Sequence, residues 1–127
     1  MEMMLDTNAL SAWADADAAL LRVLPKDRLW HLPVVALGEF LFGIRRSRER
    51  TQLERWIEAV KASCAIAEVD GDTADHYATL REELRAAATP IPENDLWIAA
   101  LCRQHHLPVA SRDAHFDHVR GLKRVTW

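Results

Sequence analysis

Short apolar runs alternate with helix-forming segments along the whole chain, and this alternation limits the fold more than any other feature. The runs that favour strands cover residues 3–6, 29–32, 65–69, 108–111 and 122–126. Strands that alternate with helices are joined by right-handed crossovers into a parallel sheet, and helices then cover both of its faces. The sequence therefore predicts an α/β fold.

The segments between the predicted strands have the composition and spacing of helices. We expect helices over residues 8–14, 16–24, 34–44, 74–88 and 94–105, with Asn94 as the N-cap of the last one. A further helix is predicted around residues 53–60, where apolar side chains recur at the spacing of one helix face. Residues 70–73 are expected to form a turn that leads into the helix at residue 74.

Length and composition indicate one ordinary domain over residues 1–127, with 50% hydrophobic and 28% charged residues. The formal net charge of -3 gives no large basic surface, so any nucleic-acid site must be local. No signal peptide and no apolar run of membrane-spanning length is apparent. Cys64 and Cys102 lack the spacing of a zinc site, which favours two buried, reduced thiols. These features favour a cytoplasmic protein without a membrane partner.

Three acids follow predicted strands or lie at the start of a predicted helix. Asp6 ends the first apolar run, Asp95 lies in the first turn of its helix, and Asp113 follows the fourth run. Each also has an ordinary explanation, Asp6 as a helix cap, Asp95 as a partner of the helix dipole and Asp113 as a turn residue. Asp117 lies four residues after Asp113 and is expected to be solvated.

Glu39 is the only charged side chain in the segment LPVVALGEFLFGI, residues 32–44. A helix that is apolar on nearly all sides should be buried. A buried carboxylate needs a partner, a metal ion or a proton. The alternative is a lone exposed glutamate on a half-covered helix, and we favour the functional interpretation.

The four acids are more informative together than singly. If the first strand is central and the fourth lies beside it, Asp6 and Asp113 flank the crevice where the strand order reverses. Glu39 and Asp95 would reach this crevice from their helices. Two carboxylates about 4 Å apart repel by about 4 kcal/mol at an effective dielectric of about 20. Protons or a divalent cation must therefore compensate. Because all-oxygen ligands suit Mg²⁺ or Mn²⁺, we favour such an ion and the phosphoryl-transfer chemistry that it serves.

The segments that carry these acids resemble, in order and spacing, the acidic motifs of PIN-domain nucleases. They are Leu5-Asp6-Thr7-Asn8, the segment from Glu39 to Gly43, the segment from Asn94 to Ala100, and the segment from Ser111 to Phe116. The size and the compact C-terminal end are similar to the VapC toxin branch of that family. The resemblance covers essentially the whole chain.

The resemblance implies a three-layer α/β/α sandwich around a five-stranded parallel sheet with a central first strand. It also implies Mg²⁺- or Mn²⁺-dependent hydrolysis of single-stranded RNA and a cognate VapB-type antitoxin that inhibits it. We also expect a homodimer, since some of the five tryptophans are candidates for a dimer or antitoxin interface, where aromatic residues are enriched. Carried over by position, the catalytic and metal-binding acids are Asp6, Glu39, Asp95 and Asp113. The supporting polar residues are Thr7, Asn8 and Ser111, and Ser111 stands where the family often has threonine.

Arginines are the candidate contacts for the RNA backbone. Arg45 and Arg46 begin a cluster of arginines, for which a solvated helix end is an equal alternative. Arg112 lies nearer to the predicted crevice and is favoured as a phosphate contact. His115 is close to Asp113 in sequence, but we favour a surface or capping role over ligation.

Other classes of protein share part of this pattern. A phosphatase with an aspartyl nucleophile needs a second Asp where this chain has Asn8. A receiver-like signalling domain fits the length, with Asp70 as phospho-acceptor and Lys123 as its lysine, but it leaves Glu39 unexplained. A PIN nuclease of RNA processing and a non-catalytic PIN-like binding module are further alternatives. The presence of all four acids argues against the binding module.

Overall fold

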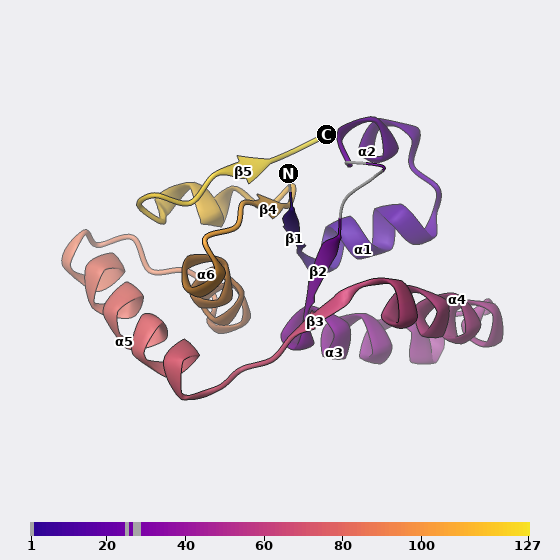
Figure 1. Ribbon diagram of the computed structural model, residues 1–127, viewed down its shortest axis with the longest axis horizontal. Helices are drawn as coiled ribbons and strands as arrows, with labels where there is room; N and C mark the ends of the chain where they lie inside the picture. Colours follow the sequence, from indigo (N-terminus) through magenta and orange to yellow (C-terminus); the bar gives the residue numbers. More distant parts are fainter. Residues whose placement is uncertain (1, 25, 27–28) are drawn as a thin grey trace.

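A five-stranded parallel sheet forms the centre of the structure, a computed structural model that describes residues 2–24, 26 and 29–127 (Figure 1). In spatial order the strands are β3 (Ala65–Ala67), β2 (Trp30–Pro33), β1 (Met3–Leu5), β4 (Val109–Ala110) and β5 (Arg124–Val125). Every neighbouring pair runs parallel. The parallel sheet and its central first strand confirm the prediction.

The pairing of β1 with β4 determines where ligands can bind. All residues of β1 are buried, as expected of a central strand that is covered on both faces. Met4 lies opposite Val109, and Leu5 lies opposite Ala110. The chain continues to β2 and β3 on one side of β1 and to β4 and β5 on the other. The strand order therefore reverses between β1 and β4, and their carboxyl ends form the usual crevice of such sheets.

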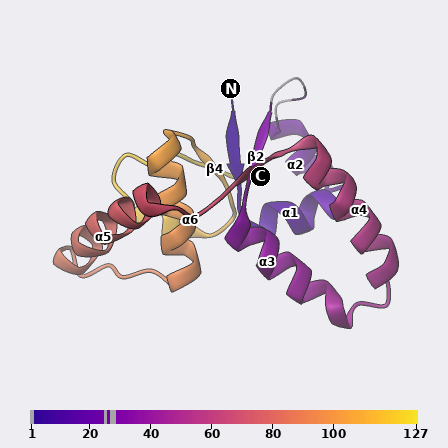
Figure 2. The same cartoon turned by 60° about the horizontal axis from the view of Figure 1, so that its bottom comes forward.

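Helices cover both faces of the sheet, as the two views of the ribbon show (Figures 1 and 2). One layer contains α5 (Gly71–Ala86) and α6 (Glu93–His105). The other layer contains α1 (Thr7–Ala14), α2 (Ala18–Val23), α3 (Val34–Gly43) and α4 (Arg50–Ser63). The short 3-10 helices η1 (Ile44–Arg46) and η2 (Ala114–His118) follow α3 and β4. In the described part of the chain, no helix is long and apolar enough to cross a membrane.

Aspartate caps determine where α2 and α5 begin. The Asp17 carboxylate accepts hydrogen bonds from two amides in the first turn of α2, so this helix begins at residue 18 rather than 16. Asp70 forms a capping box with Thr73, so α5 begins at residue 71 and the expected turn is its first turn. The spacing of apolar residues does not show which of several nearby polar residues caps a helix.

The expected cap of α6 is wrong. Pro92 is the N-cap residue, and Asn94 lies inside the first turn. The proline ring fixes φ and removes an N–H group that would lack a partner at a helix start. The helix therefore begins directly after Pro92, at Glu93, and Asp95 stays in its first turn.

α3 is less buried than its composition predicts. Leu37 and Phe40 face the core, whereas Phe42 is 76% exposed and Val34 is 40% exposed. The helix packs against α1 and α6, and its remaining face is open to solvent. The expectation of a helix buried on nearly all sides is therefore wrong, and Glu39 is half-buried.

One continuous hydrophobic core joins the sheet to both helix layers. Leu5 of β1, Leu80 of α5 and Ile98 of α6 are fully buried in it. Cys102 is buried as expected, Cys64 is half-buried, and both thiols are free.

Replacing Leu80 tests the packing of α5 on this core. Leu80→Ala is expected to lower the free energy of unfolding by about 2–5 kcal/mol, because it removes buried methyl groups and leaves a cavity. Thr79→Ala changes an exposed neighbour on the same helix and is expected to change the free energy by less than about 0.5 kcal/mol. Urea unfolding followed by circular dichroism measures both values. Equal losses in the two variants would contradict this packing.

Candidate metal centre

Asp6 lies at the carboxyl end of β1, and each of its carboxylate oxygens has a different partner. Oδ1 accepts a hydrogen bond of 2.7 Å from the Thr7 amide, and Asp6 is the N-cap of α1. Oδ2 accepts a hydrogen bond of 2.7 Å from the hydroxyl of Ser111, which follows β4. Asp6 is only 4% exposed. It is therefore both a helix cap and a buried carboxylate at the strand crevice.

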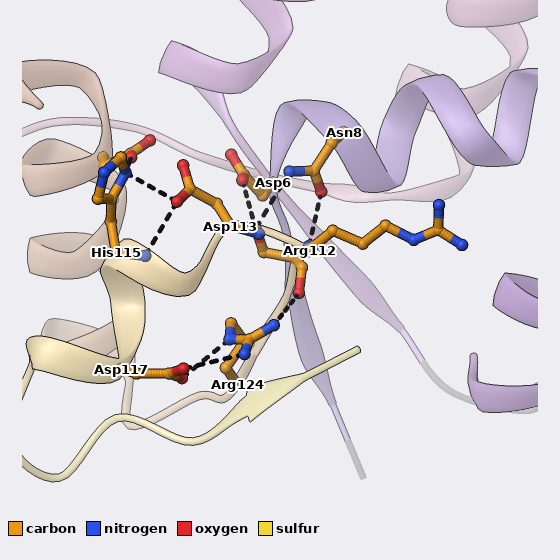
Figure 3. Close-up of polar contacts among 9 residues, drawn as sticks. Asp6, Asn8, Arg112, Asp113, His115, Asp117 and Arg124 are labelled. Atoms are coloured by element: carbon orange, nitrogen blue, oxygen red, sulfur yellow. Dashed lines mark hydrogen bonds and ion pairs between the residues drawn. The ribbon is translucent and has the colours of Figure 1, made fainter. Parts of the chain in front are cut away.

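Ser111 connects the ends of β1 and β4. Its hydroxyl oxygen also accepts hydrogen bonds from the Asp113 amide at 2.9 Å and from Nδ2 of Asn8 at 3.3 Å. Oδ1 of Asn8 accepts a hydrogen bond of 3.1 Å from the Arg112 amide (Figure 3). Ser111 and Asn8 therefore hold the loop after β4 against the start of α1.

Asp95, Asp113 and His115 form a cluster in which one donor atom from each residue lies within 4.8 Å of the others. Nδ1 of His115 is 2.7 Å from Oδ1 of Asp113 and 3.2 Å from Oδ2 of Asp95. Asp95 comes from the first turn of α6, whereas Asp113 is the N-cap of η2. The cluster therefore joins the helix layer of α5 and α6 to the loop after β4.

Glu39 and Thr7 line a pocket between α1 and α3, and the amide of Thr7 donates to the carboxylate of Asp6. The charge of Glu39 acts on Asp6 and raises its pKa, although Glu39 does not belong to the cluster around Asp113. The hydroxyl oxygen of Thr7 is buried and has no hydrogen-bond partner among the described residues. A buried hydroxyl without a partner needs an explanation, and a bound ion or water supplies one.

Burial raises the pKa of Asp6, and the negative charges of Glu39 and Asp113 raise it further. Hydrogen bonds to Asp6 act in the opposite direction without cancelling the rise. Burial, a hydrogen bond with Asp113 and repulsion by Asp113 and Asp6 raise the pKa of Asp95 to about 7. Both acids therefore bind protons more strongly than an ordinary aspartate does.

The pKa of Asp113 moves the other way. Burial raises the pKa of Asp113, but three hydrogen bonds lower it by more. They are formed with the His115 amide, the Asp95 side chain and the His115 ring, and the pKa therefore lies below its usual value. The same contact with Asp113 raises the pKa of His115. The Asp113 carboxylate thus favours the protonated form of the neighbouring Asp95 and His115 side chains.

The residues present fit a divalent cation. Asp6, Asp95 and Asp113 repel one another and supply hard oxygen donors, which is the donor set that Mg²⁺ and Mn²⁺ prefer. The raised pKa values of Asp6 and Asp95 indicate that positive charge is favoured here. Thr7, whose buried hydroxyl has no partner in the described part of the chain, follows Asp6 directly and donates its amide to it.

Other residues that the sequence singled out lie outside this cluster. Asp117 accepts hydrogen bonds of 2.8 Å and 2.9 Å from Arg124. The Arg112 side chain extends away from Asp6 and Asp113 (Figure 3). Its Nε donates a hydrogen bond of 3.1 Å to the Trp127 carbonyl.

Arg45 and Arg46 are exposed in η1, at the end of α3. A role for these two residues or for Arg112 in RNA binding stays a prediction.

The position of His115 was not anticipated from the sequence. Phe116 is fully buried and anchors η2, and this turn places the His115 ring beside Asp113. The sequence shows an acid, a histidine and an aromatic residue close together, at Asp113, His115 and Phe116. It does not show that Asp95 approaches them, because this depends on how α6 packs on the sheet.

Fold and site together define an α/β protein with a cluster of carboxylates at its strand crevice that suits a divalent cation. Residues 3–122 match the family described as "PIN domain". The chain therefore belongs to the PIN-domain family. PIN ribonucleases generally use a divalent metal ion, which agrees with the donor set described above.

Named relatives extend over most of the chain. The chain is 32% identical over 124 residues to Ribonuclease VapC5 of Mycobacterium tuberculosis, which covers 95% of this chain and 90% of the relative. It is 25% identical over 99 residues to Ribonuclease VapC4 of the same organism, covering 76% of each chain.

Solved structures show the same fold. VapBC-5 from Mycobacterium tuberculosis is a member of the VapBC family of toxin-antitoxin systems, and the match has 29% identity and a TM-score of 0.77 over 99% of this chain and 98% of that chain. VapBC2 from Rickettsia felis, bound to a DNA fragment, matches with 22% identity and a TM-score of 0.86 over 100% and 99% of the two chains. At 22% identity, the match to the Rickettsia felis structure supports a likeness in fold and nothing further.

The pKa of Asp95 leads to a prediction about pH and divalent ions. Because its folded-state value of about 7 lies above the ordinary 3.8, protonated Asp95 stabilises the fold at low pH, and this contribution is lost as the pH rises toward 7. A divalent ion replaces the proton, so Mg²⁺ or Mn²⁺ is expected to raise Tm more at about pH 7.5 than at about pH 5.5.

Thermal unfolding of the wild type and of Asp95→Asn, with and without the ion, measures this difference. Asp95→Asn is expected to reduce the shift in Tm at the higher pH, because the amide is a weaker ligand. A shift in the wild type that does not depend on pH would contradict the competition between proton and metal.

Proposed function

We propose that this protein is a Mg²⁺- or Mn²⁺-dependent endoribonuclease that hydrolyses single-stranded RNA and acts as the toxin of a toxin-antitoxin pair. The observation that carries the proposal is the convergence of acids from three separate elements on the end of β1. Asp6 follows β1, Asp113 follows β4, and Asp95 reaches them from α6. A single PIN domain over residues 1–127 is part of the proposal.

The acids have different parts in the proposed reaction. Asp6, Asp95 and Asp113, with Glu39 from α3, would hold the divalent ion, which supplies a Lewis acid and activates water toward a phosphodiester. Ser111 fixes the carboxylate of Asp6 and the amide of Asp113 through one hydroxyl. These contacts keep the acids in place before substrate binds, which is what electrostatic stabilisation of a transition state requires.

Both the RNA substrate and the antitoxin partner are proposed from the relatives. Two of them are named ribonucleases, and a solved relative at 29% identity is a toxin-antitoxin system. Arg45 and Arg46 are exposed and available for contacts with RNA phosphates. A VapB-type antitoxin, a homodimer and a cytoplasmic location complete the proposal.

The receiver-like alternative is wrong. The chain matches the PIN family, and Asp70 has a structural role as the N-cap of α5. Lys123 lies beside the amino end of β4, because its carbonyl accepts a hydrogen bond from the Val109 amide.

A PIN nuclease of RNA processing is a narrower alternative. A short adjacent reading frame that encodes a small DNA-binding protein would favour the toxin.

Asp95→Asn tests the proposal against a matched acid. The variant is expected to lose at least about 100-fold in cleavage of single-stranded RNA with Mg²⁺ or Mn²⁺, because it removes a charge from the metal centre. Asp72→Asn changes an acid in the first turn of α5, as Asp95 lies in the first turn of α6, and is expected to cleave normally.

EDTA is expected to abolish cleavage by the wild type and by Asp72→Asn alike. Circular dichroism checks that each variant is folded. Cleavage by Asp95→Asn at the rate of the wild type, in a preparation free of other nucleases, would overturn the assignment of the site.

A further inference from the structure

The His115 ring occupies a position between two acids of the metal centre. Its Nδ1 atom is 2.7 Å from Oδ1 of Asp113 and 3.2 Å from Oδ2 of Asp95. Neighbouring ligands of an octahedral ion with bonds of about 2.1 Å lie about 3 Å apart. Both distances from Nδ1 are therefore close to the spacing of neighbouring ligands, and the three donor atoms of the cluster lie within 4.8 Å of one another.

The local backbone holds the ring in this place. Asp113 accepts a hydrogen bond of 2.9 Å from the His115 amide, so the two residues are tied through main chain as well as side chain. The next residue, Phe116, is fully buried and fixes the turn in the core. The His115 side chain is 48% exposed, which leaves its outer edge open to solvent.

We infer that Nδ1 of His115 is a ligand of the divalent ion held by Asp95 and Asp113, and that it shifts the preference of the site from Mg²⁺ toward first-row transition ions. This inference rests on the metal centre of the proposed function. Imidazole nitrogen binds transition ions better than it binds Mg²⁺, which prefers oxygen.

A different role for His115 predicts the opposite effect. If the ring serves only as a positive counter-ion for Asp95 and Asp113, a metal ion must displace it. Removing the ring would then leave metal affinity unchanged or increase it. The sign of the change in affinity distinguishes a ligand from a displaced counter-ion.

His115→Ala and His118→Ala form a matched pair for this test. Both residues lie in η2 and are exposed, but only His115 contacts the acids of the cluster. Titration of each protein with Mn²⁺, followed by electron paramagnetic resonance, gives the affinity for Mn²⁺. Competition of Mg²⁺ with bound Mn²⁺ gives the affinity for Mg²⁺. Pulsed electron paramagnetic resonance detects directly whether the electron spin of bound Mn²⁺ couples to a histidine ¹⁴N nucleus.

The wild type and His118→Ala are expected to show ¹⁴N coupling, and His115→Ala is expected to lose it together with about tenfold in Mn²⁺ affinity. The loss of Mg²⁺ affinity is expected to be smaller. Bound Mn²⁺ without ¹⁴N coupling, or unchanged affinity in His115→Ala, overturns the inference and leaves the proposed function standing. Absence of any divalent-ion binding by the wild type overturns the proposed function itself.

A separate observation concerns Arg124, whose guanidinium binds both ends of the loop that carries Asp113 and His115. At the start of this loop, Nη1 donates a hydrogen bond of 3.2 Å to the Ser111 carbonyl. At its end, Nε and Nη2 donate to the two carboxylate oxygens of Asp117 at 2.8 Å and 2.9 Å. Figure 3 shows the Arg124 fork and Asp117 below Asp113.

The geometry points to Arg124 as a positioning residue that sets the affinity of the metal centre through this loop, without contact to the ion. Its planar fork binds the Asp117 carboxylate bidentately, which fixes direction as well as distance. The loop is then held at residues 111 and 117, and Asp113 and His115 lie between these two points.

Arg103 provides a matched control. It also binds a carboxylate and a main-chain carbonyl, with hydrogen bonds of 2.8 Å to Glu83 and 2.7 Å to the Arg120 carbonyl. Its side chain is 23% exposed, compared with 18% for Arg124. Arg103 joins α6 to α5 and to the turn before β5, so its loss should not move the loop that carries Asp113.

Arg124→Gln is expected to weaken Mn²⁺ binding about tenfold at a temperature where the variant is folded, whereas Arg103→Gln binds normally. Arg124→Lys keeps the charge without the fork and is expected to restore only part of the affinity. Normal Mn²⁺ affinity in Arg124→Gln, or an equal loss in Arg103→Gln, overturns the positioning role.

Discussion

The parallel register of β1 and β4 is the constraint on which the rest of the site depends. It places the residue after each strand side by side, so that the Ser111 hydroxyl reaches Asp6 at 2.7 Å. The same hydroxyl orients the Asp113 amide, and Asn8 supports the loop from α1. Polar residues far apart in the chain become neighbours because two short buried strands pair in one register.

The carboxylates at this site repel one another, and the pKa values of the acids shift in different directions. Asp6 and Asp95 have raised pKa values because they are buried near other carboxylates. Asp113 avoids the same rise through hydrogen bonds to His115 and Asp95. A cation at the cluster would relieve this repulsion, and two of the carboxylates are already held, Asp6 by the Thr7 amide and the Ser111 hydroxyl and Asp113 by the His115 amide. The arrangement favours an ion over an empty site.

The fold and most of the acids follow from the sequence because alternation of strands and helices fixes a parallel sheet, and strand ends fix Asp6 and Asp113. The sequence identifies Glu39 on the expectation that α3 is buried on nearly all sides. This expectation is wrong, since one face of the helix is open to solvent. His115 and Arg124 depend on how η2 and β5 pack. That packing is long-range and leaves no periodic signal in the sequence.

The contact between Arg124 and the loop after β4 also orders the events of folding. Asp113 and His115 precede Arg124 in the chain, and Arg124 belongs to β5, the edge strand that pairs with β4. During synthesis on the ribosome, all four carboxylates therefore emerge before Arg124, the residue that fixes the loop of Asp113. The metal centre acquires its final support only when β5 has docked, which links maturation of the site to completion of the sheet.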